Sequence, residues 1–111
     1  MGQKPERLLI VVTTCDQRDD AEKLASLSVE KRLAACAQVS GPITSYYWWK
    51  DRQERAEEWQ IRMKTTHSGY KRLENFIREN HPYELPQIVA FDVDQALPEF
   101  ALWVAEITEG K

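Results

Sequence analysis

The chain has 111 residues, of which 42% are hydrophobic and 30% charged, and its formal net charge is -3. These values indicate one soluble domain over residues 1–111, with an ordered core over about 7–107. The negative charge and the lack of a basic stripe argue against nucleic-acid binding. No apolar run approaches the roughly 20 residues that span a bilayer, and no signal peptide precedes the first predicted strand. We therefore expect a cytoplasmic protein that does not bind a membrane.

The two cysteines do not make a disulfide framework in a chain of this kind. Cys36 lies in the apolar segment 33–37, which is typical of a core residue. Cys15 lies where a strand gives way to a polar turn, which is a more accessible place for a thiol, although an inert loop cysteine fits that position equally well.

The first third of the chain predicts a strand, a helix and a second strand. Residues 8–12 form a continuous apolar run, as in a central strand that is covered on both faces. Acidic residues at 16–20 suit the start of a helix, and apolar positions at helical spacing extend it to about Leu33. Residues 34–39 predict a strand, and Gly41-Pro42 predicts a bulge or bend after it.

A long β-hairpin is predicted from Gly41 to Thr66. Its return arm alternates apolar and polar residues from Trp59 to Lys64, and the mostly charged segment 50–58 predicts a solvated tip. Its first arm carries large rings on both faces, namely Tyr46, Tyr47, Trp48 and Trp49. One face can pack on the chain's own helices, but the other needs a second cover. The hairpin is therefore interpreted as an assembly device.

The rest of the chain predicts a helix, a strand and a helix. Ser68 is the expected cap of a helix that ends at His81-Pro82, residues 87–93 predict a strand, and Pro98 opens the last helix. The order β-α-β-β-α-β with a C-terminal helix predicts an α+β, ferredoxin-like fold. Two helices would cover one face of its antiparallel sheet, and subunits would meet on the other.

Few sequence motifs indicate catalysis or ligand binding. Neither a nucleotide-binding glycine motif nor a convincing nucleophile-base pair is present, so we do not expect an enzyme. The segment His81-Pro82-Tyr83-Glu84-Leu85-Pro86 is either a rigid turn or part of a site. The sequence leaves open whether Cys15 and His81 approach one another. If they did, a thiolate, an imidazole and nearby carboxylates would suit copper or zinc.

The chain resembles the CutA proteins, which are associated with divalent-cation tolerance. The resemblance covers Leu8 to about Trp103 and rests on several motifs in a consistent order. These are Val12-Thr13-Thr14, Arg32-Leu33-Ala34-Ala35-Cys36, Ser45-Tyr46-Tyr47-Trp48-Trp49, Lys64-Thr65, and the His81–Pro86 segment.

The resemblance implies a ferredoxin-like protomer in a homotrimer assembled through the 41–66 hairpin. It also implies a bound divalent metal ion, chiefly copper, near the end of the first strand and the His81 loop. We name Cys15, His81 and Glu84 as the candidate ligands. Family members in which copper ligation is argued carry cysteine, histidine and glutamate at positions that are Thr13, Asn80 and Gln87 here. A glycine that is usual at the hairpin tip is replaced by Asp51.

Two other interpretations remain open. The chain is also similar to nitrogen-regulatory signalling trimers, which implies a small anionic ligand in a cleft between subunits. Tyr46, Trp49, Lys64 and Tyr83 are the candidate residues of that cleft. Alternatively, assembly is itself the selected property, which predicts unusual resistance to heat.

Overall fold

The computed structural model describes residues 7–109, so both ends of the predicted domain lie outside the described residues. It contains four strands and three helices within that range, in the order that the sequence predicts. The elements are β1 (Leu8–Cys15), α1 (Arg18–Glu30), β2 (Cys36–Trp49), β3 (Arg52–Thr66), α2 (Tyr70–Asn80), β4 (Val89–Asp92) and α3 (Pro98–Thr108).

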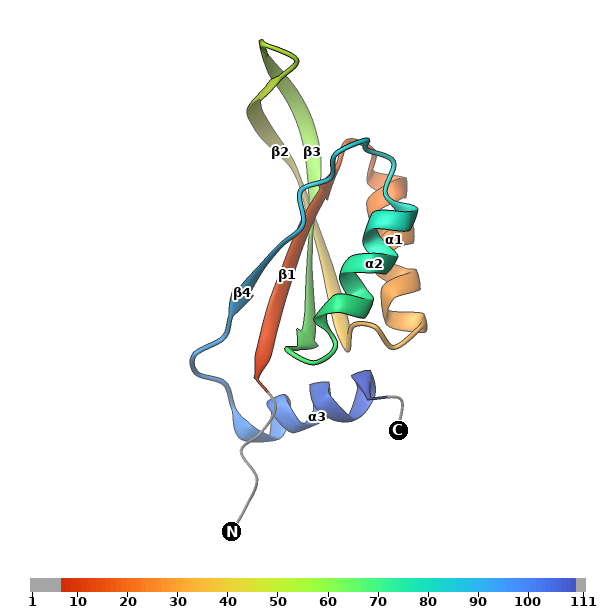
Figure 1. Cartoon of the computed structure of the whole chain (residues 1–111), viewed down its shortest axis with the longest axis vertical. Helices are drawn as coiled ribbons and strands as arrows, with labels where there is room; N and C mark the ends of the chain where they lie inside the picture. Colours follow the sequence, from red (N-terminus) through yellow and green to blue (C-terminus); the bar gives the residue numbers. More distant parts are fainter. Residues whose placement is uncertain (1–6, 110–111) are drawn as a thin grey trace.

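The four strands form one sheet in the order β2-β3-β1-β4 (Figure 1). Every neighbouring pair is antiparallel. The predicted α+β ferredoxin-like fold is therefore confirmed. β1 lies between β3 and β4, which explains its continuous apolar run, because a central strand is covered on both faces.

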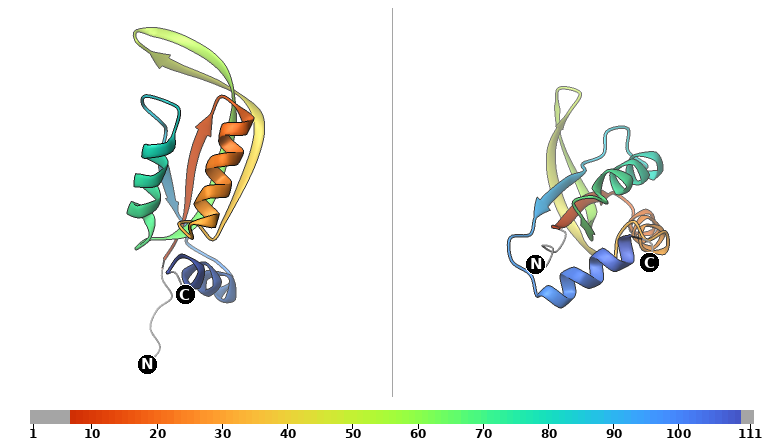
Figure 2. Two further views of the ribbon diagram at one scale, coloured as in Figure 1. Left: turned by 90° about the vertical axis from the view of Figure 1, so that its right-hand side faces the viewer. Right: turned by 60° about the horizontal axis from the view of Figure 1, so that its bottom comes forward.

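Helices α1 and α2 cover one face of the sheet, and the main core lies beneath them (Figure 2). Alternate residues of β1 and β3 point into this core, where they meet the apolar stripes of the two helices. The fully buried members are Val11, Cys15, Ala21, Ala34, Ile61, Met63, Leu73 and Ile77. This arrangement leaves the other face of the sheet without either helix.

The second face is only partly covered by the chain itself. Helix α3 lies across one end of the sheet (Figure 1), where Ala101 and Val104 pack on Leu8 and Ala35. Farther along, Phe91 pairs with Ile10 in the register of β4 and β1, so it lies on the face opposite α1 and α2. Its side chain is 56% exposed. The sequence predicted that one face of the sheet would stay uncovered, and the exposed Phe91 of β4 lies on that face.

The hairpin differs from its prediction at the tip. The charged segment 50–58 is not a loop, because β2 and β3 stay paired out to Trp49 and Arg52, and the turn between them has only two residues. Charged residues are tolerated in these outer strands because the hairpin projects beyond the core, as the 55 Å long axis of the molecule shows (Figure 1). The expectation that the whole segment is solvated is wrong for Glu58, which is buried.

A β-bulge interrupts the pairing of β2 with β3 between Ser40 and Ile43, as Gly41-Pro42 predicted. The peptide bond between Gly41 and Pro42 is cis. Gly41 has a φ of 149°, and a Cβ atom there would lie 2.9 Å from the carbonyl oxygen of Glu58. Only glycine allows the two strands to approach so closely at this point.

The predicted ends of the helices need small corrections. α1 ends at Glu30 rather than near Leu33, because the chain turns at Arg32 with a φ of 57°. Ser68 does not cap α2, whose N-cap is Gly69, and the backbone N–H of Gly69 donates to the Thr66 hydroxyl instead. β4 is shorter than its predicted range of 87–93.

Candidate functional site

Cys15 and His81 meet within a single protomer. Cys15 ends β1 and His81 ends α2, and the packing of α2 on the sheet brings the thiol sulfur to 3.7 Å from His81 Nε2. The question that the sequence left open is thereby answered without a second subunit. The contact joins two of the three candidate metal ligands.

Both ring nitrogens of His81 already have hydrogen-bond partners. The backbone N–H of Tyr83 donates to Nδ1 at 3.1 Å, so Nε2 carries the proton and donates it to the carbonyl oxygen of Thr14 at 2.8 Å. Burial lowers the pKa of His81, although Thr14, Glu58 and Asp16 oppose that shift. A neutral imidazole with both nitrogens engaged fixes the loop after α2, which is a structural role.

The thiol of Cys15 is held in its protonated form. Its side chain is fully buried, and burial raises the pKa of Cys15 to about 11, with Asp20 and Asp16 adding to the effect. A metal ion or an electrophile requires the thiolate. The Cys15–His81 pair is therefore neither a thiolate-imidazolium pair nor, as folded, a ready metal ligand set.

The third candidate ligand does not complete a metal site. Glu84 is exposed, and among residues 7–109 no three His, Cys, Asp and Glu side chains are grouped so that they could hold a metal ion. At the positions where the family resemblance places ligands, Thr13 is buried and Asn80 donates its side-chain amide to the carbonyl of Phe76. Within one protomer, the residues that the structure describes do not fit a copper or zinc ion.

A groove lies next to this pair, between the outer half of the hairpin and the loop after α2. Figure 2 shows the hairpin curling above that loop. The groove has a volume of about 740 Å³ and is lined by Thr14, Asp16, Tyr47, Trp48, Trp49, Ala56, Glu58, Tyr83, Glu84, Leu85, Pro86 and Gln87. Aromatic rings and carboxylates predominate in this lining, and the described part of the chain contributes neither lysine, arginine nor histidine to it.

The floor of the groove is tied together by Glu58 and Tyr83. The phenol of Tyr83 donates to Glu58 Oε2 at 2.6 Å, and Glu58 is only 7% exposed. Burial, together with the hydrogen bond to Glu58, raises the pKa of Tyr83 far above its usual range. The phenol therefore stays a donor at every physiological pH.

Only two of the four residues predicted to line a cleft lie on this groove. Trp49 and Tyr83 line the groove, whereas Tyr46 and Lys64 do not. The hydroxyl of Tyr46 accepts a hydrogen bond from Arg55 Nε, and Lys64 donates to the side chain of Gln38. Glu58 was missed, because its place on the groove depends on how the bulge and the 81–86 loop lie relative to one another, and no local sequence pattern reports that arrangement.

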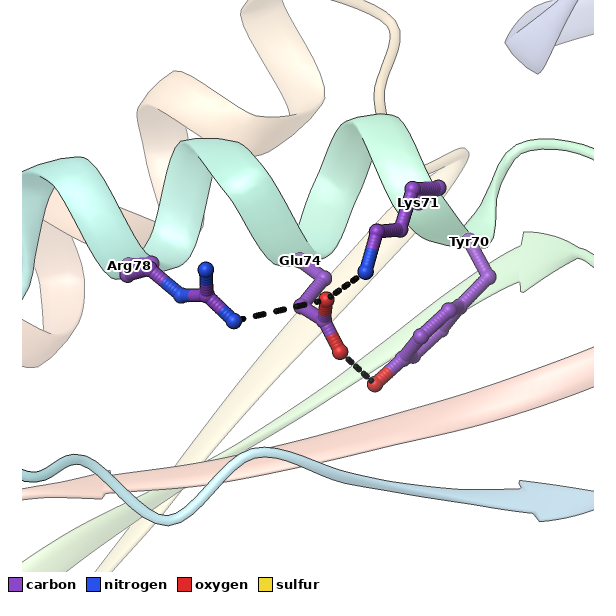
Figure 3. A network of polar contacts seen from close by, with 4 residues as sticks. All are labelled: Tyr70, Lys71, Glu74 and Arg78. Carbon is purple, nitrogen blue, oxygen red and sulfur yellow. Dashed lines mark hydrogen bonds and ion pairs between the residues drawn. The ribbon is translucent and has the colours of Figure 1, made fainter.

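A second polar cluster lies on the surface of α2 (Figure 3). Glu74 accepts from the hydroxyl of Tyr70 and from Lys71, each at 2.7 Å, and Arg78 lies 3.7 Å away. The hydrogen bond from Lys71 is the largest of the contacts that lower the pKa of Glu74, and burial raises the pKa of Tyr70 to about 12. All four groups satisfy one another at helical spacing, so the cluster stabilises the helix and offers no open site.

None of the helices within residues 7–109 is long and apolar enough to cross a membrane.

Comparison with known proteins gives one consistent family. The family profile described as CutA1 divalent ion tolerance protein matches residues 9–107. Protein CutA of Mus musculus is 37% identical over 97% of this chain, and the chain spans 61% of that relative's length. The crystal structure of the divalent ion tolerance protein CutA1 from Ehrlichia chaffeensis is 31% identical, with a TM-score of 0.88 over 95% of this chain and 98% of the other.

A third relative differs in its description. The structure of an Archaeoglobus fulgidus protein, described as a periplasmic divalent cation tolerance protein CutA, is 30% identical, with a TM-score of 0.87 over 91% of this chain and 98% of its own. The match of fold, of sequence and of nearly the whole length of this chain shows that it belongs to the CutA1 family of divalent ion tolerance proteins.

Proposed function

We propose that the chain acts in divalent-cation tolerance as a non-enzymatic homotrimer. The trimer would assemble through the 41–66 hairpin and the open face of the sheet. It would bind a divalent metal ion, and copper is the first candidate. The observation that carries this proposal is the exposed apolar surface of a small domain that belongs to the CutA1 family.

Large apolar side chains are exposed on both the hairpin and the open face of the sheet. Trp48 on the hairpin is 75% exposed, and Val89 and Phe91 stand on the open face at 40% and 56%. Large apolar side chains that are exposed often mark an interaction surface, and assembly would bury them with a gain of about 25 cal/mol per Å². Pairing of the hairpins would also protect strand edges that project beyond the core.

The non-enzymatic part of the proposal is supported by the state of the Cys15–His81 pair. A nucleophilic cysteine has a lowered pKa and an open approach, whereas the pKa of Cys15 is raised and its side chain is buried. The signalling alternative receives no support from the groove, because an anionic ligand would face Asp16, Glu58 and Glu84, and residues 7–109 place no cation in the lining.

Copper binding remains a prediction, which rests on the family resemblance and on the preference of copper for sulfur and imidazole ligands. Thiolate and imidazole are ligands that copper prefers, and Cys15 and His81 would supply one of each once the metal ion displaces the thiol proton. Because the two do not form a three-ligand group with Glu84 in one protomer, we do not derive a coordination geometry from them.

Two separate measurements test the two parts. Native mass spectrometry of the chain should give three times the protomer mass, and a stable folded monomer would overturn the trimer.

For the metal, protein stripped with EDTA is titrated with Cu²⁺ and Zn²⁺, and bound metal is counted for the wild type and for Cys15→Ala, His81→Ala and Glu84→Ala. Cys36→Ala and His67→Ala are the matched controls. Unchanged stoichiometry in the first three variants would remove those residues from any metal site.

A further inference from the structure

We propose that the groove between the hairpin and the loop after α2 binds an organic cation, namely an ammonium group carried on an apolar or aromatic body. This goes beyond metal tolerance and reverses the charge of the ligand that the signalling interpretation expects. It rests on the cavity, on its charges and on its rings, and does not depend on a bound metal.

The cavity has the size and wall of a small-molecule site. Its volume of about 740 Å³ lies within the range of about 300–1,000 Å³ that is usual for ligand pockets. Four aromatic residues line it, three from β2 and one from the loop, and they provide flat apolar faces with negative electrostatic character. They are Tyr47, Trp48, Trp49 and Tyr83. Such walls suit the body of an amphipathic ligand.

The charge of the lining selects a cation. Asp16, Glu58 and Glu84 contribute three carboxyl groups, and among residues 7–109 no basic side chain lines the groove. Glu58 is the strongest attractor, because it is more than nine-tenths buried and its hydrogen-bond partner is a neutral phenol. The ion pairs found among residues 7–109 do not include Glu58. A buried carboxylate without a cation is costly, so an incoming ammonium would be stabilised there.

The rings of the hairpin already receive cations from the chain itself. The ammonium of Lys50 lies 5.8 Å from the centroid of the Trp49 ring, and the guanidinium of Arg55 lies 6.0 Å from that of Tyr46. Trp49 is also part of the groove wall. A ligand ammonium near Glu58 would therefore combine an ion pair with cation-π contacts of a kind that this hairpin makes elsewhere.

Two probes of similar shape and opposite charge test the proposal. Phenethylamine and 3-phenylpropionate are titrated into the full-length protein at pH 7.5, with EDTA present so that metal ions do not contribute. Binding is followed by isothermal titration calorimetry and by tryptophan fluorescence. We expect saturable binding of phenethylamine and at least tenfold weaker binding of 3-phenylpropionate.

Matched variants locate the cation. Glu58→Gln keeps an acceptor for Tyr83 but removes the charge, and it should weaken phenethylamine at least fivefold. Glu57→Gln makes the same change one residue earlier, at an exposed position outside the groove, and should have no effect. If Glu58→Gln does not fold, Asp16→Asn at the exposed edge of the groove provides the test, with an expected loss of at least twofold.

Three results would overturn the proposal. The first is equal binding of the two probes, and the second is an equal loss in Glu57→Gln and Glu58→Gln. The third is that neither probe binds while Glu58→Gln lowers the mass of the assembly, which would mean that a basic side chain of a second copy fills the groove. A missing metal would leave all of these readouts unaffected, and a missing trimer would remove only the change in mass, so failure of the proposed function is distinguishable from failure of probe binding.

Discussion

The hydroxyl of Tyr83 donates a hydrogen bond of 2.6 Å to Glu58 and so joins the loop after α2 to the middle of β3. The same loop is held at its other end by His81, whose Nε2 donates to the carbonyl of Thr14 at 2.8 Å. Two polar contacts to two different strands therefore position one wall of the groove. Each contact can be removed separately.

Replacing Tyr83 by phenylalanine should lower the free energy of unfolding by about 1–3 kcal/mol, because a nearly buried carboxylate then loses its hydrogen-bond partner. Urea denaturation at pH 7.5 measures the change. Tyr47→Phe is the control, since that hydroxyl belongs to an exposed ring of the same groove. An equal loss in both variants would show that the hydrogen bond to Glu58 contributes nothing.

Acidification should destabilise the protein through His81. Burial lowers the pKa of this imidazole below its usual 6.5 in the folded state, so the unfolded chain takes up the proton first. Stability is therefore fully present above about pH 6.5 and falls as the pH drops through the folded-state value, by at most about 1.4 kcal/mol per pH unit.

Urea midpoints between pH 7.5 and 5 test this expectation. The decline should become shallower in His81→Gln, which cannot take up the proton, and should stay unchanged in His67→Gln, since His67 is exposed. A wild-type decline that persists undiminished in His81→Gln would assign the effect to other groups.

Alkaline pH should destabilise the protein through Cys15. Burial is the main cause that raises the pKa of this thiol from 9.0 to about 11, so the unfolded chain loses the proton first. Stability should begin to fall near pH 9 and continue to fall toward pH 11. Denaturation between pH 8 and 9.5 reports mainly on Cys15, because Tyr70 and Tyr83 begin to destabilise the fold only when the phenols of the unfolded chain ionise near pH 10.

Cys15→Ala should be less stable at pH 8, because a buried group is lost, but its stability should change less as the pH rises. Cys36→Ala is the matched control, since that thiol is only half-buried. If the slope of stability against pH is the same in Cys15→Ala and in the wild type, the thiol is not the titrating group.

The order of elements could be predicted because it depends on local patterns. The apolar run of β1, the alternation in β3 and the periodic stripe of α2 each report burial within a few residues. The position of Glu58 could not be predicted in this way. Its burial depends on the bulge at 41–42 and on a loop that follows it by 25 residues.

The candidate site was predictable only in part for the same reason. Cys15 and His81 are 66 residues apart, and their contact follows from the way α2 packs on the sheet. Residue types alone suggested a metal ligand pair, whereas the hydrogen bonds of His81 and the burial of Cys15 describe a structural contact. The exposure of Tyr46, Tyr47 and Trp48 follows more directly from the sequence, because the charged residues around these rings leave no core in which they could pack.

The tip of the hairpin offers a last test. Lys50 and Asp51 form its two-residue turn with φ values of 50° and 63°, as in a type I′ turn, which prefers asparagine and then glycine. Asp51→Gly should therefore stabilise the fold by about 0.5 kcal/mol, since relief of the left-handed conformation exceeds the added freedom of the unfolded chain. Asp51→Ala removes the same carboxylate without that relief and should be destabilising. Urea denaturation of both variants decides the point, and equal shifts in the two would mean that charge, not backbone conformation, sets the stability of this turn.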